Sequence, residues 1–174
     1  MASYYYLMSS LPMLRADGTM PITYKKFLSY CKDSVSGANY ELLENLSVDS
    51  KKGVLISEWA EFYSAFKEEL TYQRNKKAEK SVPQPTGVDI EVKKTISAAV
   101  NDENPLNAEN TLLALQFDRL DSLIGIHSFD DYALFGYAMK LKLLERKTVF
   151  DQKAGKDEFT RLVKGLEEQI NRIN

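Results

Sequence analysis

The residues best suited to catalysis or metal binding are scarce in this chain. It contains one histidine, His127, and one cysteine, Cys31. A zinc or iron site takes several such ligands, so the sequence predicts no metal site of that kind. A Cys–His nucleophilic pair would also need an orienting group and an oxyanion hole, and no family signature surrounds either residue. We therefore expect His127 to be a loop or helix-cap residue.

Carboxylates are the remaining candidates for catalysis. The chain has 25 acidic residues, so a pair of carboxylates acting in a helical cleft stays open as an alternative. Asp118, Asp121 and Glu145 fall on predicted helices, where acids three residues apart are ordinary surface features. No Walker A motif and no GxGxxG motif is present. The sequence predicts a protein that is not an enzyme and that needs no cofactor.

Two groups of charged residues are candidate contacts with a partner protein. Arg74, Lys76 and Lys77 end a predicted long helix, and Glu145 and Arg146 follow two leucines in a strongly apolar helix. The alternative is that both groups are solvated, since charge runs usually lie on the surface. Glu145 and Arg146 could also form a partly buried pair with each other.

Nucleic acid is not an expected partner. The formal net charge is −2, so no overall field attracts the chain to polyanions. The basic residues are few and local, and no DNA- or RNA-binding motif accompanies them. No apolar run approaches the roughly 20 residues of a membrane span, so we expect no direct membrane insertion. The chain is expected to be cytoplasmic, and to reach a membrane only through a partner.

The apolar spacing predicts an all-α fold, a bundle of about seven helices. In the first half, the aromatic segment 4–12 is expected to be buried against the body of the protein. Thr23 is the expected cap of a short helix, and Ser57 that of a long helix with Trp59 on its apolar face.

Helix signals are stronger in the second half. Asn104 and Pro105 read as the cap and first residue of a helix that Gly125 closes. Residues 128–131 form a Ser-x-x-Asp capping pattern before the most apolar helix, which we expect to lie centrally. Gly136 within it suggests close helix contact. A final helix is expected over an apolar stripe: Phe159, Leu162, Val163, Leu166, Ile170 and Ile173.

A proline-rich segment divides the sequence. Residues 81–87 read Ser-Val-Pro-Gln-Pro-Thr-Gly, and two prolines two residues apart cannot continue a helix. This predicts two packed helical lobes: an N-terminal lobe over 1–80 and a C-terminal lobe over 88–174, joined by a linker over 81–87.

Several segments together resemble an uncharacterised bacterial family encoded in V-type ATPase/ATP synthase operons. The segments are Tyr4–Leu14 (YYYLMSSLPML), Asn104–Leu106 (NPL), Phe117–Asp121 (FDRLD), Leu143–Arg146 (LLER), Phe150–Asp151 and Gly155. That family is similar to the C-type (or d-type) subunit of V-type ATPases, an all-helical socket between the rotor ring and the central stalk.

The resemblance implies a function. The chain would be a non-catalytic structural or accessory subunit of a rotary ATPase that moves protons or sodium ions, contacting rotor or stalk subunits at the membrane periphery. The alternatives are a transient assembly factor of the same complex, and an unrelated carboxylate-using enzyme. The chain is about half the length of a usual C-type subunit, so the resemblance does not imply the three-lobed shape.

Overall fold

The computed structural model describes residues 4–148. This part of the chain contains seven α-helices and no strand, which confirms the predicted all-α fold. The helix expected over residues 159–173 lies outside the described residues. The helices are α1 (Tyr5–Ser10), α2 (Tyr24–Cys31), α3 (Gly37–Glu44), α4 (Ile56–Lys77), α5 (Ile90–Asn101), α6 (Pro105–Ile124) and α7 (Asp131–Thr148).

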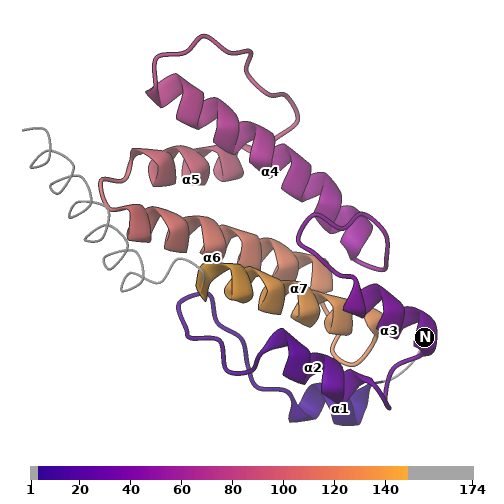
Figure 1. The fold of residues 1–174 in the computed structure, drawn as a ribbon. Coiled ribbons are helices and arrows are strands. Elements are labelled where there is room, and N and C mark those ends of the chain that lie inside the picture. Colours follow the sequence, from indigo (N-terminus) through magenta and orange to yellow (C-terminus); the bar gives the residue numbers. More distant parts are fainter. Residues whose placement is uncertain (1–3, 149–174) are drawn as a thin grey trace, which may run out of the picture.

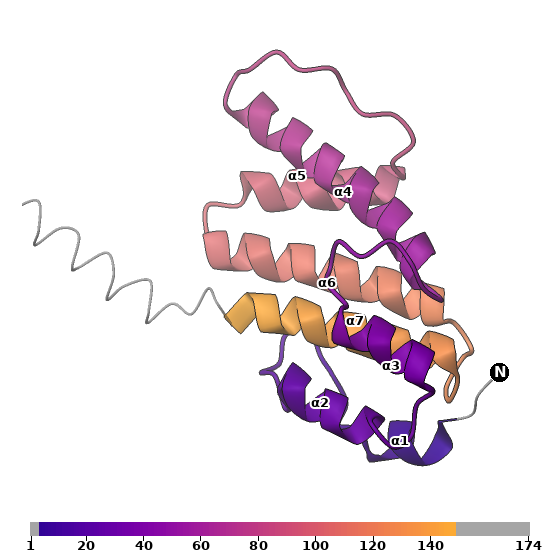
Figure 2. The ribbon, with the colours of Figure 1, turned by 45° about the vertical axis from the view of Figure 1, so that its right-hand side comes forward.

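The four longer helices form a stack, with the three short helices against its last member. Helix α5 packs between α4 and α6, α6 packs on α7, and α2 packs on α7 and α3 (Figure 1). Figure 2 shows the same order from another side. Nine residues of α7 are buried, because α7 has α6 on one face and the short helices on another. The expected central position of α7 is therefore confirmed.

The loop that holds residues 81–87 joins α4 to α5, and these two helices pack against each other. The buried side chains form one cluster that includes Trp59 and Phe66 from α4 and Ile96 and Ala99 from α5. The chain therefore turns back on itself after the prolines. The division into lobes at 1–80 and 88–174 stays a prediction.

The opening aromatic segment is buried only in part. Tyr4 and Leu7 are 4% and 6% exposed, whereas Tyr5 and Tyr6 are 54% and 88% exposed. The prediction of a buried segment was wrong for Tyr5 and Tyr6, because a short helix lying on the surface can turn only one face to the core.

Two helix starts in the first half depend on different forces. The Thr23 hydroxyl accepts a hydrogen bond from the Lys26 backbone N–H at 3.2 Å, which confirms the predicted cap of α2. The predicted Ser57 cap of α4 was wrong. That helix begins at Ile56, preceded by Leu55 at φ 63°, and both side chains are buried. Burial of two large apolar groups outweighs the modest gain from a serine cap.

The predicted boundaries of α6 are confirmed. The Asn104 side chain accepts from the Leu106 N–H at 3.0 Å, Pro105 is the first helical residue, and Gly125 follows the helix with φ 55°. The expected close contact at Gly136 is also present. A Cβ there would collide with the Ile124 side chain. The two helices therefore approach closely at a position where α7 has no side chain.

The cap of α7 is Asp130 and not Ser128. Asp130 Oδ1 accepts from the backbone N–H groups of Tyr132 and Ala133 at 3.1 and 3.2 Å. Its other oxygen bonds to His127 Nδ1. Burial raises the pKa of Asp130, but its hydrogen bonds to His127 and Ala133 outweigh burial and hold the pKa below its usual value.

We expect Asp130→Ala to lower the free energy of unfolding by about 0.5–2 kcal/mol, the usual cost of losing a cap. The folded-state pKa lies below the unfolded one, so this contribution is present above the unfolded pKa and disappears as pH falls through the folded pKa. Urea unfolding at neutral and acidic pH measures it. Ser128→Ala is the matched control and should change little. An equal loss of stability in both variants would contradict this assignment and would indicate that Ser128 also caps α7.

Candidate interaction surfaces

The antiparallel helices α6 and α7 place two distinct surfaces at their opposite ends. The closed end is the loop 125–130 between the helices. The open end holds the first turn of α6 and the last turn of α7. A 20-residue helix is about 30 Å long, so the two surfaces are well separated. Figure 1 shows α1 near the closed end.

An aromatic cluster lies at the closed end. It consists of Tyr5 and Tyr6 of α1 and Phe129 of the loop. The ring centroids of Tyr5 and Phe129 are 4.8 Å apart, and those of Tyr5 and Tyr6 are 5.6 Å apart at an edge-to-face angle of 86°. Phe129 is 39% exposed, and Ile126 in the same loop is 97% exposed. Three adjacent exposed rings form an aromatic patch on the surface, a feature that can mark an interaction site.

Tyr4 fixes this cluster to the rest of the protein. Its backbone N–H donates to the Phe129 carbonyl at 2.6 Å, and its hydroxyl donates to Asp131 Oδ1 at 2.8 Å. Asn39 Nδ2 donates to the same carboxylate oxygen at 2.8 Å. Burial raises the pKa of Tyr4, and Asp131 raises it further, although the bond from Asn39 lowers it. The hydroxyl therefore stays protonated and keeps donating.

His127 lies in the loop at the closed end, as expected. Its ring stacks on Tyr132 with centroids 4.5 Å apart and bonds to the capping carboxylate of Asp130. Within residues 4–148, no group of three or more His, Cys, Asp or Glu side chains is placed to hold a metal ion. His127 is thus part of the α7 cap.

A hollow of about 740 Å³ lies at the open end. Its walls come from the loop 17–20, the first three turns of α6 and the last turns of α7. The apolar residues of the wall are Met20, Pro105, Leu106, Leu113, Leu143 and Leu144. Asn110 also lines it, with a buried Oδ1 that has no hydrogen-bond partner within the described structure. The wall is mostly apolar, which suits an apolar occupant.

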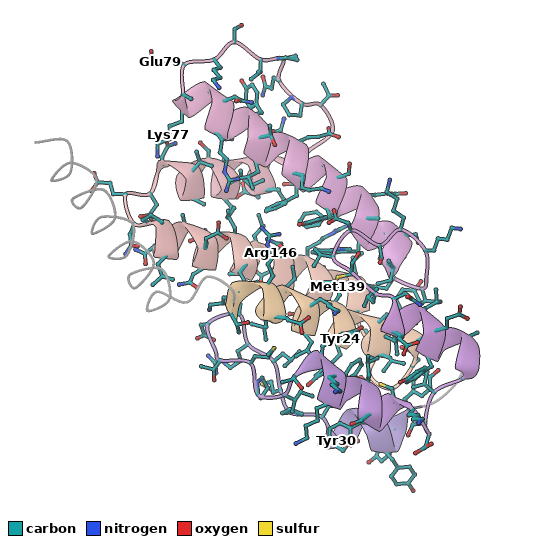
Figure 3. The ribbon with its side chains drawn as sticks, viewed as in Figure 1. Tyr24, Tyr30, Lys77, Glu79, Met139 and Arg146 are labelled. Atoms are coloured by element: carbon teal, nitrogen blue, oxygen red, sulfur yellow. The ribbon has the colours of Figure 1, made fainter. Side chains whose placement is uncertain are left out.

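The predicted basic contacts lie near this open end. A smaller hollow of about 340 Å³ is lined by Arg74 and Lys77, and shares Pro105 and Glu109 with the larger one. Arg74 lies 3.9 Å from the Glu109 carboxylate, and the Lys77 ammonium donates to the Val100 carbonyl at 2.5 Å. Lys76 is exposed. Figure 3 shows Lys77 at the end of α4.

Glu145 and Arg146 bond to different partners and not to each other. Lys142 Nζ donates to Glu145 at 3.1 Å, and Arg146 Nη1 donates to the Tyr63 hydroxyl at 3.0 Å. The prediction that the two could pair was wrong, because adjacent helical residues point in different directions. Arg146 lines the larger hollow and ties α7 to α4 (Figure 3).

Several groups within residues 4–148 that catalysis could use are paired or buried, whereas the candidate Asp118 is exposed. Asp17, on the wall of the larger hollow, bonds to Arg15 at 3.0 Å, and this bond holds its pKa below the usual value. Asp121 pairs with Lys140. Cys31 is fully buried, and burial raises the pKa of its thiol to about 12, so the thiol is not ionised at neutral pH.

One buried carboxylate has no evident role. Glu69 of α4 is fully buried, with one oxygen accepting from Gln73 Nε2 at 2.7 Å and the other without a partner within the described structure. It lines neither hollow.

Sequence reasoning found the basic residues but not the two surfaces. The aromatic cluster was signalled by three consecutive tyrosines, which cannot all face the core from one short helix. The hollow had no local signal, because its walls come from three separate segments.

No helix between residues 4 and 148 is both long enough and apolar enough to span a membrane.

Comparisons of the chain with known protein families, with curated proteins and with solved structures find no match.

Proposed function

We propose that this protein is a non-catalytic structural or accessory subunit of a V-type ATPase, bound to rotor or stalk subunits through the aromatic cluster. The observation that carries the proposal is the exposure of Tyr5, Tyr6 and Phe129 on one contiguous patch. Tyrosine and other aromatic rings supply large contact areas at low entropic cost and are enriched among the dominant contacts of protein interfaces.

The hydrogen bonds that hold the aromatic cluster in place favour binding. Tyr4 ties α1 to Phe129 and to the first residue of α7 by two short hydrogen bonds, so the rings are held before a partner arrives. Pre-ordered side chains lose less entropy on binding, which favours affinity. A rigid surface of this kind suits a connector between larger subunits.

The identity of the partner rests on the resemblance to the family of V-type ATPase operons. The opening segment Tyr4–Leu14 is among its most specific parts, and the same segment forms α1 and two rings of the aromatic cluster. Two of the three candidate acids, Asp121 and Glu145, pair with lysines, which also favours a binding role over carboxylate catalysis.

The test is affinity purification of the tagged full chain from its native cells in mild detergent, followed by a sizing column. V-type ATPase subunits should co-purify in matching amounts. The double variant Tyr5→Ser, Tyr6→Ser should reduce their recovery at least about tenfold, as loss of 1.4 kcal/mol or more would. Tyr30→Ser removes a ring that is 41% exposed on α2 and is the matched control.

The other outcomes decide between the alternatives. If ATPase subunits are present only as traces that wash away, the protein is a transient assembly factor of the complex and not a permanent subunit. Absence of ATPase subunits would reject the proposed partner. Equal recovery with the double variant and the wild type would reject the aromatic cluster as the contact.

A further inference from the structure

The larger hollow has an apolar wall and a size that suits a small molecule. Leu113, Leu143 and Leu144 are 7%, 2% and 1% exposed, whereas Leu106 on the first turn of α6 is 48% exposed. These leucines and Met20 line the hollow, whose volume is about 740 Å³. Binding sites for small molecules commonly enclose about 300–1,000 Å³ behind mostly apolar walls. The hollow has both the size and the lining of such a site.

The two acids on the wall each have a cation of their own. Asp17 pairs with Arg15 at 3.0 Å, and Glu109 lies 3.9 Å from Arg74. Neither arginine lines the hollow. Arg15 is also the main cause of the lowered pKa of Asp17, whereas Lys147 contributes least to it. The negative charges on the wall are therefore partly offset from outside the hollow.

The two cations on the wall bond to neutral groups. Arg146 Nη1 donates to the Tyr63 hydroxyl at 3.0 Å, and Lys147 Nζ donates to the Ala16 carbonyl at 3.0 Å. Within residues 4–148, no carboxylate forms an ion pair with either cation. An apolar wall next to two such cations suits a molecule with a hydrocarbon chain and an anionic end.

We propose that this hollow binds a fatty acid. The hydrocarbon chain lies against Leu113, Leu143 and Leu144, where its burial removes apolar surface from water. The carboxylate faces Arg146 and Lys147, because charge-assisted hydrogen bonds to a carboxylate are stronger than bonds to neutral acceptors. A free molecule suits the site better than a bilayer, since the three leucines are recessed and cannot insert into a membrane.

This inference does not rest on the proposed function. The hollow lies at the opposite end of α6 and α7 from the aromatic cluster, so either proposal can fail while the other stands.

The test uses the full chain and dodecanoate, kept below the concentration at which it forms micelles. Isothermal titration calorimetry should show saturable binding of one molecule per chain. Dodecyltrimethylammonium has a chain of the same length and the opposite charge. It should bind at least about tenfold more weakly, because the two cations repel it.

Variants then locate the site. Leu106→Glu places a negative charge on the wall and should weaken dodecanoate binding at least about tenfold. Lys147→Gln removes one cation and should weaken it about fivefold. Ile90→Glu is the matched control for the added charge, because Ile90 is 68% exposed and lines neither hollow. This control and the double variant Tyr5→Ser, Tyr6→Ser should both bind like the wild type.

Four results would overturn the proposal. They are no saturable binding of dodecanoate, equal binding of dodecanoate and its cationic analogue, binding that Leu106→Glu and Lys147→Gln leave unchanged, and binding lost in the double tyrosine variant. The last result would assign the fatty acid to the aromatic cluster.

Discussion

Trp59→Ala should lower the free energy of unfolding by about 3–5 kcal/mol, the largest single loss we expect in this protein. Trp59 is fully buried in α4 and stacks on Tyr63, with ring centroids 5.3 Å apart at 16°. Its indole N–H donates to the Val48 carbonyl at 3.0 Å, which fastens the loop before α4 to the helix. Alanine leaves a cavity and also removes the donor to that carbonyl.

Urea unfolding followed by far-ultraviolet circular dichroism measures this loss, since the variant lacks the tryptophan that fluorescence would report. Trp59→Phe should fall between wild type and Trp59→Ala, because phenylalanine fills much of the space but donates no hydrogen bond. Glu68→Ala, at an exposed position on the same helix, is the control and should stay within about 0.5 kcal/mol. A Trp59→Ala variant as stable as this control would contradict the described packing of α4.

Gly136→Ala should lower the free energy of unfolding by about 1–3 kcal/mol, although alanine is the better helix former by about 1 kcal/mol. The added Cβ would lie 2.5 Å from Ile124 Cγ1 and closer still to Ile124 Cδ1. Both distances are well below van der Waals contact, so the isoleucine must move or the two helices must separate. Chemical unfolding gives the loss directly.

Gly37→Ala is the matched control, because a Cβ at this position in α3 would meet nothing within 4 Å. It should leave stability unchanged or slightly raised. A double-mutant cycle with Ile124→Ala identifies the cause: the alanine at 136 should cost much less once the isoleucine is shortened. If Gly136→Ala lowers stability equally in the Ile124→Ala variant, the clash does not involve the Ile124 side chain.

Helix content and many helix ends could be predicted from the sequence because they depend on neighbouring residues. The Thr23 and Asn104 caps and the glycine that ends α6 each act within a few residues. The predictions for Ser57 and Ser128 were wrong where a second local candidate competed. Burial of Leu55 and Ile56 set the start of α4, and the Asp130 carboxylate capped α7 in place of a hydroxyl.

The candidate surfaces could be predicted only in fragments. The charged residues at 74–77 and 145–146 were found from composition, but their partners Glu109, Val100, Lys142 and Tyr63 mostly come from distant parts of the chain. The sequence prediction placed the tyrosines in a buried segment, although consecutive residues of one helix cannot all face the core. It did not indicate that Phe129 joins them.

Local patterns in the sequence specify that this chain forms helices and which faces of those helices are apolar. Packing in three dimensions sets which helices are neighbours, which tyrosines remain exposed, and that the loop 17–20, α6 and α7 line a hollow. The reason is the distance along the chain over which each interaction acts. Helix propensity and capping act over one or two turns, whereas burial and pairing join residues more than a hundred positions apart, as Tyr4 and Asp131 do.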